Sequence, residues 1–169
     1  VGGPYKVVAN LPFYAATPIV RRFLECGLPP SVIVVTVQRE VAQAMTASVG
    51  RMTLLSVAVQ LYGRPRIMGY IRPTSFRPAP KVTSAIVRID VYSGPTLPLE
   101  EGPDALFQVV RGGFSAPRKQ LRNSLAHSFG LSGEGAEEVL RQAELDPRLR
   151  AEALSLEDWG RLFKTFRSR

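Results

Sequence analysis

Runs of apolar residues near the start of the chain follow the short period of strands. The β-branched residues at 7–8 and at 32–37, and the apolar stretches at 65–72 and 82–92, each predict a strand. The continuous run at 32–37 is typical of a strand that is buried on both faces. A loop rich in proline and arginine joins the last two strands, and we interpret this pair as an antiparallel hairpin.

Helical spacing separates these strands from one another. Thr17 is a plausible N-cap and Pro18 suits the first helical position, so a helix is expected from there until Gly27 ends it. A second helix is expected at 39–48, before Gly50. The stretch 53–62 has an apolar stripe at helical spacing and predicts a third helix, although its valines also alternate as in a strand.

Glycine and proline are concentrated at 93–103, and this composition indicates a linker. We therefore divide the chain into domains at 1–93 and 94–169, the first of α/β type and the second all-helical. The second domain is expected to hold helices at 104–112, at 118–129 after Pro117, at 135–143, and from Ser155 onward. Ser155 to Asp158 resembles a capping box, and Trp159 is expected in the core.

Composition excludes several classes of protein. With 169 residues, of which 45% are hydrophobic, the chain can bury one good core or two small ones. It contains no run of 18 apolar residues, so no transmembrane helix is expected, and its start has no signal-peptide pattern. Cys26 is the single cysteine, which excludes an internal disulfide and fits a reducing cytoplasm. His127 is the single histidine, so no metal site is expected.

The formal net charge of +8 lies in the first part of the chain. Residues 1–94 carry eleven lysines and arginines against three acids, whereas the remainder carries eleven of each. A basic surface attracts polyanions such as RNA. The alternative is a solvated basic surface without a specific partner.

The stretch from Asn10 to Phe13 follows the first predicted strand and carries the candidate chemistry. Pro12 fixes its own backbone and favours an extended Leu11, which makes a short stiff loop at the carboxyl end of a strand, where open α/β sheets bind ligands. Asn10 offers an acceptor and a donor, and Phe13 offers a flat apolar face. A primary amine on a flat heterocycle needs both. The alternative is an Asn-Pro turn with a core phenylalanine.

These four residues resemble the Asn-(Ile/Leu/Pro)-Pro-(Tyr/Phe) motif of methyltransferases that modify exocyclic amines of bases. Longer blocks resemble, in the same order, those of the KsgA-type small-subunit rRNA adenine dimethyltransferases; they are residues 7–18, 38–45, 76–89, 116–125 and 146–163. The resemblance implies the C-terminal half of a Rossmann-like methyltransferase sheet, closed by an antiparallel hairpin and followed by a small helical RNA-binding domain. It also implies a cytoplasmic enzyme of ribosome biogenesis.

The resemblance further implies an activity and its residues. Methyl groups would pass from S-adenosylmethionine to the N6 amines of two adjacent adenines in small-subunit rRNA. Asn10, Leu11, Pro12 and Phe13 would form the catalytic loop, with Asn10 also touching the cofactor. Phe13 and Phe76 would stack on the base, although Phe76 alone also fits a core plug. The expected RNA-binding residues are Arg77, Lys81, Arg118, Lys119 and Arg122, for which the alternative is a solvated basic turn.

Three departures qualify the resemblance. The usual tyrosine is Phe13, and the polar residues that commonly follow it are Tyr14, Ala15 and Ala16. A glycine-rich loop and an acidic residue for the cofactor ribose are not found ahead of the motif. We therefore expect the chain to resemble only the C-terminal part of the enzyme, with weak cofactor binding and no turnover by itself. Two alternatives remain: a large-subunit rRNA methyltransferase conferring antibiotic resistance, and a non-catalytic RNA-binding or ribosome assembly factor.

Overall fold

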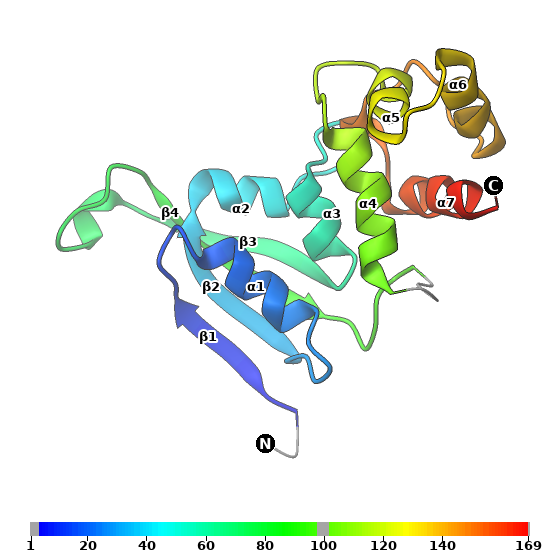
Figure 1. Cartoon of the computed structure of the whole chain (residues 1–169). Coiled ribbons are helices and arrows are strands. Elements are labelled where there is room, and N and C mark those ends of the chain that lie inside the picture. The colour runs from blue at the N-terminus through cyan, green and yellow to red at the C-terminus, as the bar shows by residue number, and fades with distance from the viewer. Residues whose placement is uncertain (1–3, 98–101, 169) are drawn as a thin grey trace. The chain divides into compact units, whose positions relative to one another are not determined.

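The computed structural model describes residues 4–97 and 102–168, and its contacts group the chain into two compact units (Figure 1). The first, which we call the sheet unit, comprises Val1–Ala47 and Leu55–Thr96. The second, the helical unit, comprises Ser48–Leu54 and Leu97–Arg169. The predicted linker at 93–103 includes residues 98–101, which lie outside the described ranges.

The sheet unit alternates strands and helices in its first part and ends in a hairpin. Its elements are β1 (Lys6–Asn10), α1 (Ala16–Leu24), β2 (Val32–Gln38), α2 (Arg39–Met45), α3 (Leu54–Gln60, whose first residue groups with the other unit), β3 (Gly63–Ile71), the short 3-10 helix η1 (Pro73–Ser75) and β4 (Ser84–Val91). The helical interpretation of 53–62 is confirmed, and its strand alternative is wrong.

The four strands form one mixed sheet in the order β1-β2-β4-β3. β1 and β2 run parallel because α1 connects them as a crossover helix, whereas β3 and β4 are antiparallel, as the predicted hairpin requires. β4 inserts between β2 and β3, so it pairs with both. The α/β class and the hairpin are therefore confirmed.

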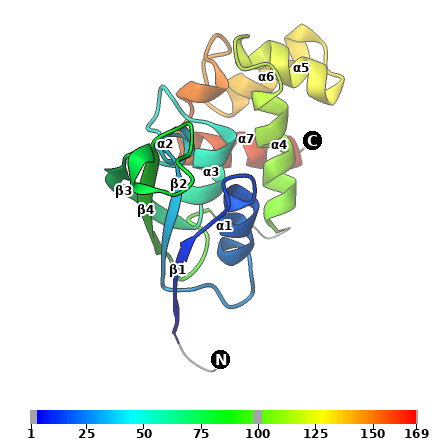
Figure 2. The same ribbon diagram turned by 90° about the vertical axis from the view of Figure 1, so that its left-hand side faces the viewer.

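One face of the sheet is covered by helices of the same unit. Figures 1 and 2 both show α1, α2 and α3 on one side of it. Residues of β2 and β4 that point to this side are at most 1% exposed; they are Ile33, Val35, Val37, Ala85, Val87 and Ile89. These β-branched and small side chains form the apolar core beneath the helices.

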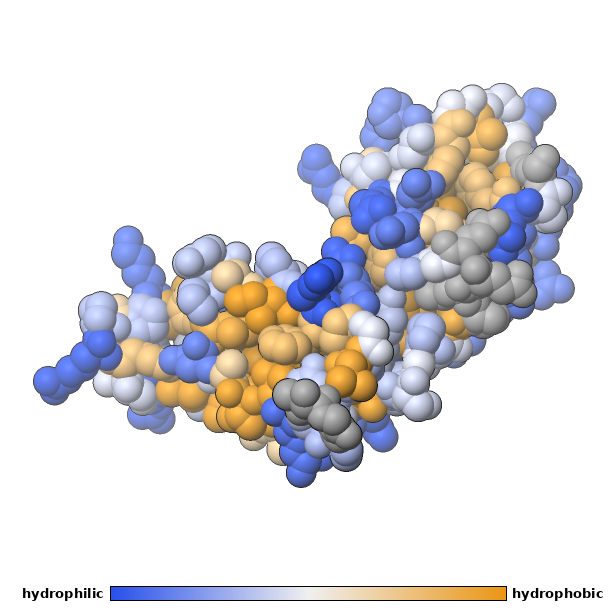
Figure 3. Space-filling model, turned by 60° about the horizontal axis from the view of Figure 1, so that its bottom comes forward, coloured by the Kyte–Doolittle hydropathy of each residue, from blue (hydrophilic) through white to orange (hydrophobic). Residues whose placement is uncertain are grey.

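Side chains on the opposite face remain half-exposed or exposed. The prediction that 32–37 is buried on both faces is wrong for the described residues, because Val32, Val34 and Thr36 of β2 are only half-buried. Val8 on β1 is 79% exposed. Figure 3, in which the bottom of Figure 1 comes forward, shows apolar residues gathered on the surface of the sheet unit.

α1 begins before the predicted cap. Its N-cap position is Ala15, which makes no side-chain cap, and its first helical residue is Ala16, so the assignment of Thr17 as N-cap is wrong. A hydrogen-bonded turn leads directly into the helix, since the Ala15 amide donates to the Pro12 carbonyl at 3.0 Å. Pro18 then falls within the first turn, where its missing N–H leaves no helical hydrogen bond unmade.

The helical unit packs helices α4 to α7 against one another, with Trp159 of α7 beside Phe114 of α4 in its core. Its elements are α4 (Pro103–Phe114), α5 (Leu121–Phe129), α6 (Gly133–Gln142), the 3-10 helix η2 (Ala151–Ala153) and α7 (Leu156–Arg167). Trp159 is fully buried, as predicted. The capping box is confirmed too, because the Ser155 hydroxyl accepts from the Asp158 amide while the Asp158 carboxylate accepts from the Ser155 amide.

α5 starts at Leu121, three residues after the predicted start at Arg118. Residues 116–119 form a turn instead, closed by the Lys119 amide donating to the Ala116 carbonyl at 2.9 Å. The Leu121 amide donates to the carbonyl of Leu149 at 2.7 Å, a partner distant in sequence. Arg118 and Lys119 therefore lie outside the first turn of α5.

Residues 48–54 connect α2 to α3 but belong to the helical unit. The amides of Gly50 and Met52 both donate to the carbonyl of Glu152, at 2.9 and 3.1 Å. Met52 is 4% exposed. Within residues 4–97 and 102–168, no helix is both long and apolar enough to cross a membrane.

Candidate functional site

Asn10 is the last residue of β1, where it is paired in register with Thr36 of β2. The side-chain amide of Asn10 makes no hydrogen bond to any other residue that the structure describes. Its oxygen and nitrogen are thus available to a ligand at the carboxyl end of the parallel strand pair.

The chain after Asn10 passes through a tight turn. Leu11 and Pro12 follow the end of the strand, and Phe13 and Tyr14 occupy the two central positions of the turn that the Ala15-to-Pro12 hydrogen bond closes. The Pro12 carbonyl is therefore engaged, whereas the Leu11 carbonyl has no backbone hydrogen-bond partner among the described residues. The Leu11 carbonyl is thus a backbone acceptor, directly after Asn10, that has no partner among the described residues.

The hairpin loop between β3 and β4 supplies the opposite wall. η1 is stabilised by amides of Ser75 and Phe76 that donate to the carbonyls of Arg72 and Pro73, at 3.0 and 3.1 Å. Phe76 leaves η1 with an extended backbone and is half-buried. The prolines that follow it, Pro78 and Pro80, fix their own φ angles and so restrict the loop.

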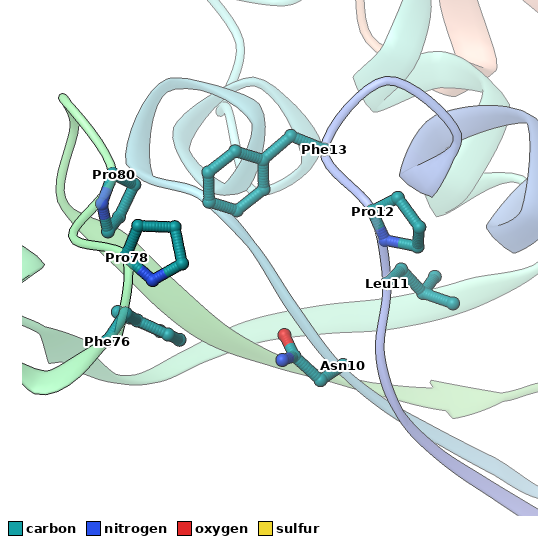
Figure 4. Close-up of a pocket in the computed structure, with 7 residues that line it drawn as sticks. All are labelled: Asn10, Leu11, Pro12, Phe13, Phe76, Pro78 and Pro80. Atoms are coloured by element: carbon teal, nitrogen blue, oxygen red, sulfur yellow. The ribbon is translucent and has the colours of Figure 1, made fainter.

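These two loops line an open cavity of about 230 Å³. Seven residues line it: Asn10, Leu11, Pro12, Phe13, Phe76, Pro78 and Pro80. Figure 4 shows the Asn10 amide and the rings of Phe13 and Phe76 directed into the same space. The structure thus brings together all five residues predicted for the catalytic loop and base stacking. Which of these residues contacts a substrate stays a prediction.

Almost all of the residues that line the cavity are apolar. Asn10 is the single polar side chain among the seven, and the other six present aromatic, proline or leucine surfaces. Asn10 itself is exposed, so its amide is reached from solvent through the open side of the cavity. The cavity therefore suits a flat aromatic ligand with one polar edge.

Pro78 and Pro80 are lining residues that the sequence interpretation did not single out. They follow Phe76 in a stretch of the loop that bends at residues 76–78, and Pro80 is half-buried there. Local pattern gives no signal for their place in the cavity wall, because that place depends on how the bent loop meets the chain after β1.

The five cations predicted to bind RNA differ in their availability. Arg77 and Lys81 are exposed on the hairpin loop at the cavity, and Arg118 and Lys119 are exposed on the turn before α5. Arg122 is half-buried, where its guanidinium pairs with Glu137 and donates to the Gln120 side chain at 3.0 Å. Arg122 thus already has partners within the helical unit, whereas the other four point to solvent.

A second cluster of charges lies on the sheet, away from the cavity. The Arg88 guanidinium donates two hydrogen bonds to Asp90, at 2.7 and 2.8 Å, and Arg66 also pairs with it. These bonds, from Arg88 first, lower the pKa of the Asp90 carboxyl below its usual value. Within the described ranges, no group of three or more histidine, cysteine or acidic side chains is placed to hold a metal ion.

Comparison with known proteins gives a consistent result. The family model of the ribosomal RNA adenine dimethylases matches residues 1–168. The ribosomal RNA small subunit methyltransferase A of Dehalococcoides mccartyi strain CBDB1 is 42% identical over 161 residues, which cover 94% of this chain and 54% of that protein. The Alkaliphilus metalliredigens protein of the same name is 40% identical, covering 99% of this chain and 59% of its own length. The chain thus spans somewhat more than half the length of these relatives.

Solved structures agree at the level of the fold. A dimethyladenosine transferase from Plasmodium falciparum superimposes with a TM-score of 0.82 at 20% identity, covering 99% of this chain and 68% of that one. The 23S rRNA methyltransferase ErmE superimposes with a TM-score of 0.68 at 23% identity, covering 98% of this chain and 66% of that one. At these identities the similarity concerns the arrangement of the elements.

Proposed function

We propose, since the chain belongs to the ribosomal RNA adenine dimethylase family, that its sheet unit forms the acceptor-base pocket of an rRNA adenine N6-dimethyltransferase. The substrate we infer is small-subunit rRNA, because the similar curated proteins are named for it. The observation that carries the proposal is the convergence of Asn10, Phe13 and Phe76 on one cavity.

The hydrogen-bonding groups of the loop match an exocyclic amine. The N6 amine of adenine is a poor nucleophile because its lone pair is delocalised into the ring. The Asn10 side-chain oxygen and the Leu11 carbonyl are two acceptors of the loop, adjacent in sequence, that have no partner among the described residues. N–H donation to both would draw the nitrogen towards a tetrahedral geometry with its lone pair directed at the incoming methyl group.

The aromatic walls would hold the base. An adenine in a duplex or in a stacked single strand must unstack from the adjacent bases before an enzyme can modify its amine. Aromatic side chains then replace the lost base stacking. Phe13 and Phe76 come from opposite loops and both face the cavity, so each can contact the base. Stacking on one aromatic ring contributes roughly 1–3 kcal/mol per base.

A dedicated general base is not needed in this scheme, since the proton can leave the nitrogen after the methyl group has been transferred. The described residues fit the acceptor base and not the methyl donor. The cavity lining holds no carboxylate for ribose hydroxyls, and Asn10 is its only polar side chain. S-adenosylmethionine supplies the electrophilic methyl group in this chemistry, and we derive no contact of this chain to it beyond the candidate Asn10.

The exposed cations on both units fit a polyanionic partner. Arg77 and Lys81 lie on the loop that lines the cavity, so they are placed to contact phosphates next to a bound base. Arg118 and Lys119 offer two further contacts on the helical unit. Arg122 is not part of this set, because its guanidinium already pairs with Glu137 and donates to the Gln120 side chain.

Two other functions compete with this one. A large-subunit rRNA methyltransferase would share the fold, as ErmE does, but the more identical relatives bear the small-subunit name. A non-catalytic RNA-binding or assembly factor would share the basic surface and need no free acceptors in the cavity. The unpartnered amide of Asn10 favours the enzyme.

The test is methyl transfer from labelled S-adenosylmethionine by the protein at its natural length, on small-subunit and large-subunit rRNA in parallel. Asn10→Ala should reduce transfer on the order of a hundredfold or more, because it removes an acceptor needed in the transition state. Gln43→Ala, which changes an exposed carboxamide on α2, is the matched control and should leave the rate unchanged. Methylation of large-subunit rRNA alone, or RNA binding without methylation, would establish one of the alternatives.

A further inference from the structure

Tyr14 shares the catalytic-loop turn with Phe13 but faces solvent. Its side chain is 90% exposed, more than any other large hydrophobic residue that the structure describes. Phe13, its neighbour at the other central position of the turn, is half-buried and lines the cavity. Two aromatic rings thus occupy adjacent positions of one tight turn, one directed at the cavity and one at water.

The backbone that carries Tyr14 is held on both sides. The Ala15 amide donates to the Pro12 carbonyl at 3.0 Å, and the Ala15 carbonyl accepts from the Ile19 amide at 3.0 Å, which joins the turn to α1. Ala16, the first residue of α1, is 1% exposed. The tyrosine therefore projects from a fixed platform, so a contact through its ring would not require the loop to become ordered first.

No contact within the described part of the protein accounts for an aromatic side chain at position 14. It takes part in no hydrogen bond, ring contact or cation–π contact with another described residue. A fully exposed aromatic side chain contributes almost no burial to folding. Its flat apolar face next to a nucleobase cavity is, however, the surface on which unpaired bases stack.

We infer that Tyr14 stacks on the unpaired base that neighbours the methylated base in the RNA chain. The inference rests on the proposed function, since it presumes that the cavity takes an RNA base. Moving one base into the cavity removes a stacking partner from each of its neighbours. The Tyr14 ring supplies a replacement face to one neighbour. Phe13 and Tyr14 together would then hold two consecutive nucleotides apart.

The inference specifies a substrate feature: a single-stranded base must adjoin the target, and its identity matters little. Every base has a flat face, so stacking on tyrosine tolerates different sequences. A fully paired neighbour, whose faces are both occupied within a helix, would gain nothing from Tyr14.

The experiment combines protein and RNA changes. Affinity of the natural-length protein is measured by fluorescence anisotropy for a hairpin RNA with the target base intact, and for matched RNAs with an abasic nucleotide on either side of the target. The variants are Tyr14→Ala, Tyr14→Leu, which keeps apolar surface without a ring, and Tyr14→Phe, which keeps the ring. Steady-state methylation of the same RNAs gives KM and kcat. Thermal unfolding shows whether each variant keeps the fold, which the 90% exposure of Tyr14 leads us to expect.

We expect Tyr14→Ala and Tyr14→Leu to weaken binding of the intact RNA about tenfold and to raise KM with little change in kcat. Tyr14→Phe should bind like the wild type. On one of the two abasic RNAs the wild type and Tyr14→Ala should become equal. An equal weakening on intact and abasic RNAs, or no weakening at all, would overturn the stacking role while methylation by the wild type leaves the proposed function standing. A wild type that neither binds nor methylates the RNA would overturn both.

Discussion

Gly113 is the position where one added methyl group has the clearest predicted effect on the helical unit. Its place in α4 leaves no room for a side chain: a Cβ there would lie 2.5 Å from Cη2 and 3.0 Å from Cζ3 of Trp159, and 3.1 Å from Cδ1 of Leu121. Carbon atoms that touch prefer a separation of about 3.5–4.0 Å. Trp159 and Leu121 are both fully buried, so neither can move aside without displacing other core residues.

Two opposing contributions set the size of the effect of Gly113→Ala. Alanine is favoured over glycine inside a helix by about 1 kcal/mol. Inserting a methyl group into a close-packed core costs roughly 1–3 kcal/mol. Because the closest approach falls short of a normal distance by about 1 Å, we expect the upper part of that range, and hence a net destabilisation of about 1–2 kcal/mol. The Tm of a chain of this size should then fall by roughly 2–8 °C.

Fluorescence of Trp159, the single tryptophan, reports unfolding of this unit directly. Gly133→Ala is the matched control, because it adds a methyl group in a helix of the same unit with no atom within 4 Å. It should not lower the Tm. Combining Gly113→Ala with Trp159→Phe, followed by circular dichroism, should cost less than the sum of the single changes, because the smaller ring relieves the clash. Additive effects, or a Gly113→Ala variant as stable as Gly133→Ala, would refute the packing argument.

Two further predictions concern charge. The hydrogen bonds from Arg88 lower the pKa of Asp90, so this carboxylate stabilises the fold above the ordinary carboxyl pKa of 3.8 and the contribution disappears as the pH falls through the lowered value. Asp90→Asn should therefore lower the free energy of unfolding at neutral pH by roughly 1 kcal/mol or less, with a modest fall in Tm. The difference in Tm between the variant and the wild type should disappear in acid, and a difference independent of pH would contradict this. Replacing both Arg118 and Lys119 by alanine should reduce the slope of log affinity for RNA against log salt by roughly 0.7–0.9 for each phosphate that the variant no longer neutralises. Lys164→Ala, an exposed cation on α7, should leave that slope unchanged, and an equal effect of both variants would argue against a specific role of the turn.

Sequence patterns located most elements because local signals and packing agree there. The β-branched strands, the hairpin and the Ser155 capping box depend on residues adjacent in sequence, and each was predictable. The candidate cavity was partly predictable, since Asn10 and Phe13 follow a strand directly. Its second wall was not derivable from local pattern, because Phe76 meets the loop only through the pairing order of the sheet.

The failures came from partners distant in sequence. Leu121 bonds to Leu149, and this hydrogen bond starts α5 later than Pro117 suggests. The run 32–37 has the composition of a strand buried on both faces, but burial depends on which elements cover the sheet, and the composition of β2 alone does not specify them. The capping role of Thr17 failed because the turn at Pro12 had already begun the helix.

Because residues 48–54 belong to the helical unit, the protein cannot be cut into its two units at a single position. The chain passes between its two compact units three times, after residues 47, 54 and 96, so neither unit is one continuous piece of sequence. A fragment that ends at residue 96 would leave the Gly50 and Met52 amides without their acceptor, the Glu152 carbonyl. A fragment that begins at residue 97 would lack the buried Met52 side chain. Exchange of the helical unit between relatives by a single recombination crossover would therefore separate partners that fold together. A functional chimera needs the 48–54 segment and the C-terminal stretch to come from the same parent.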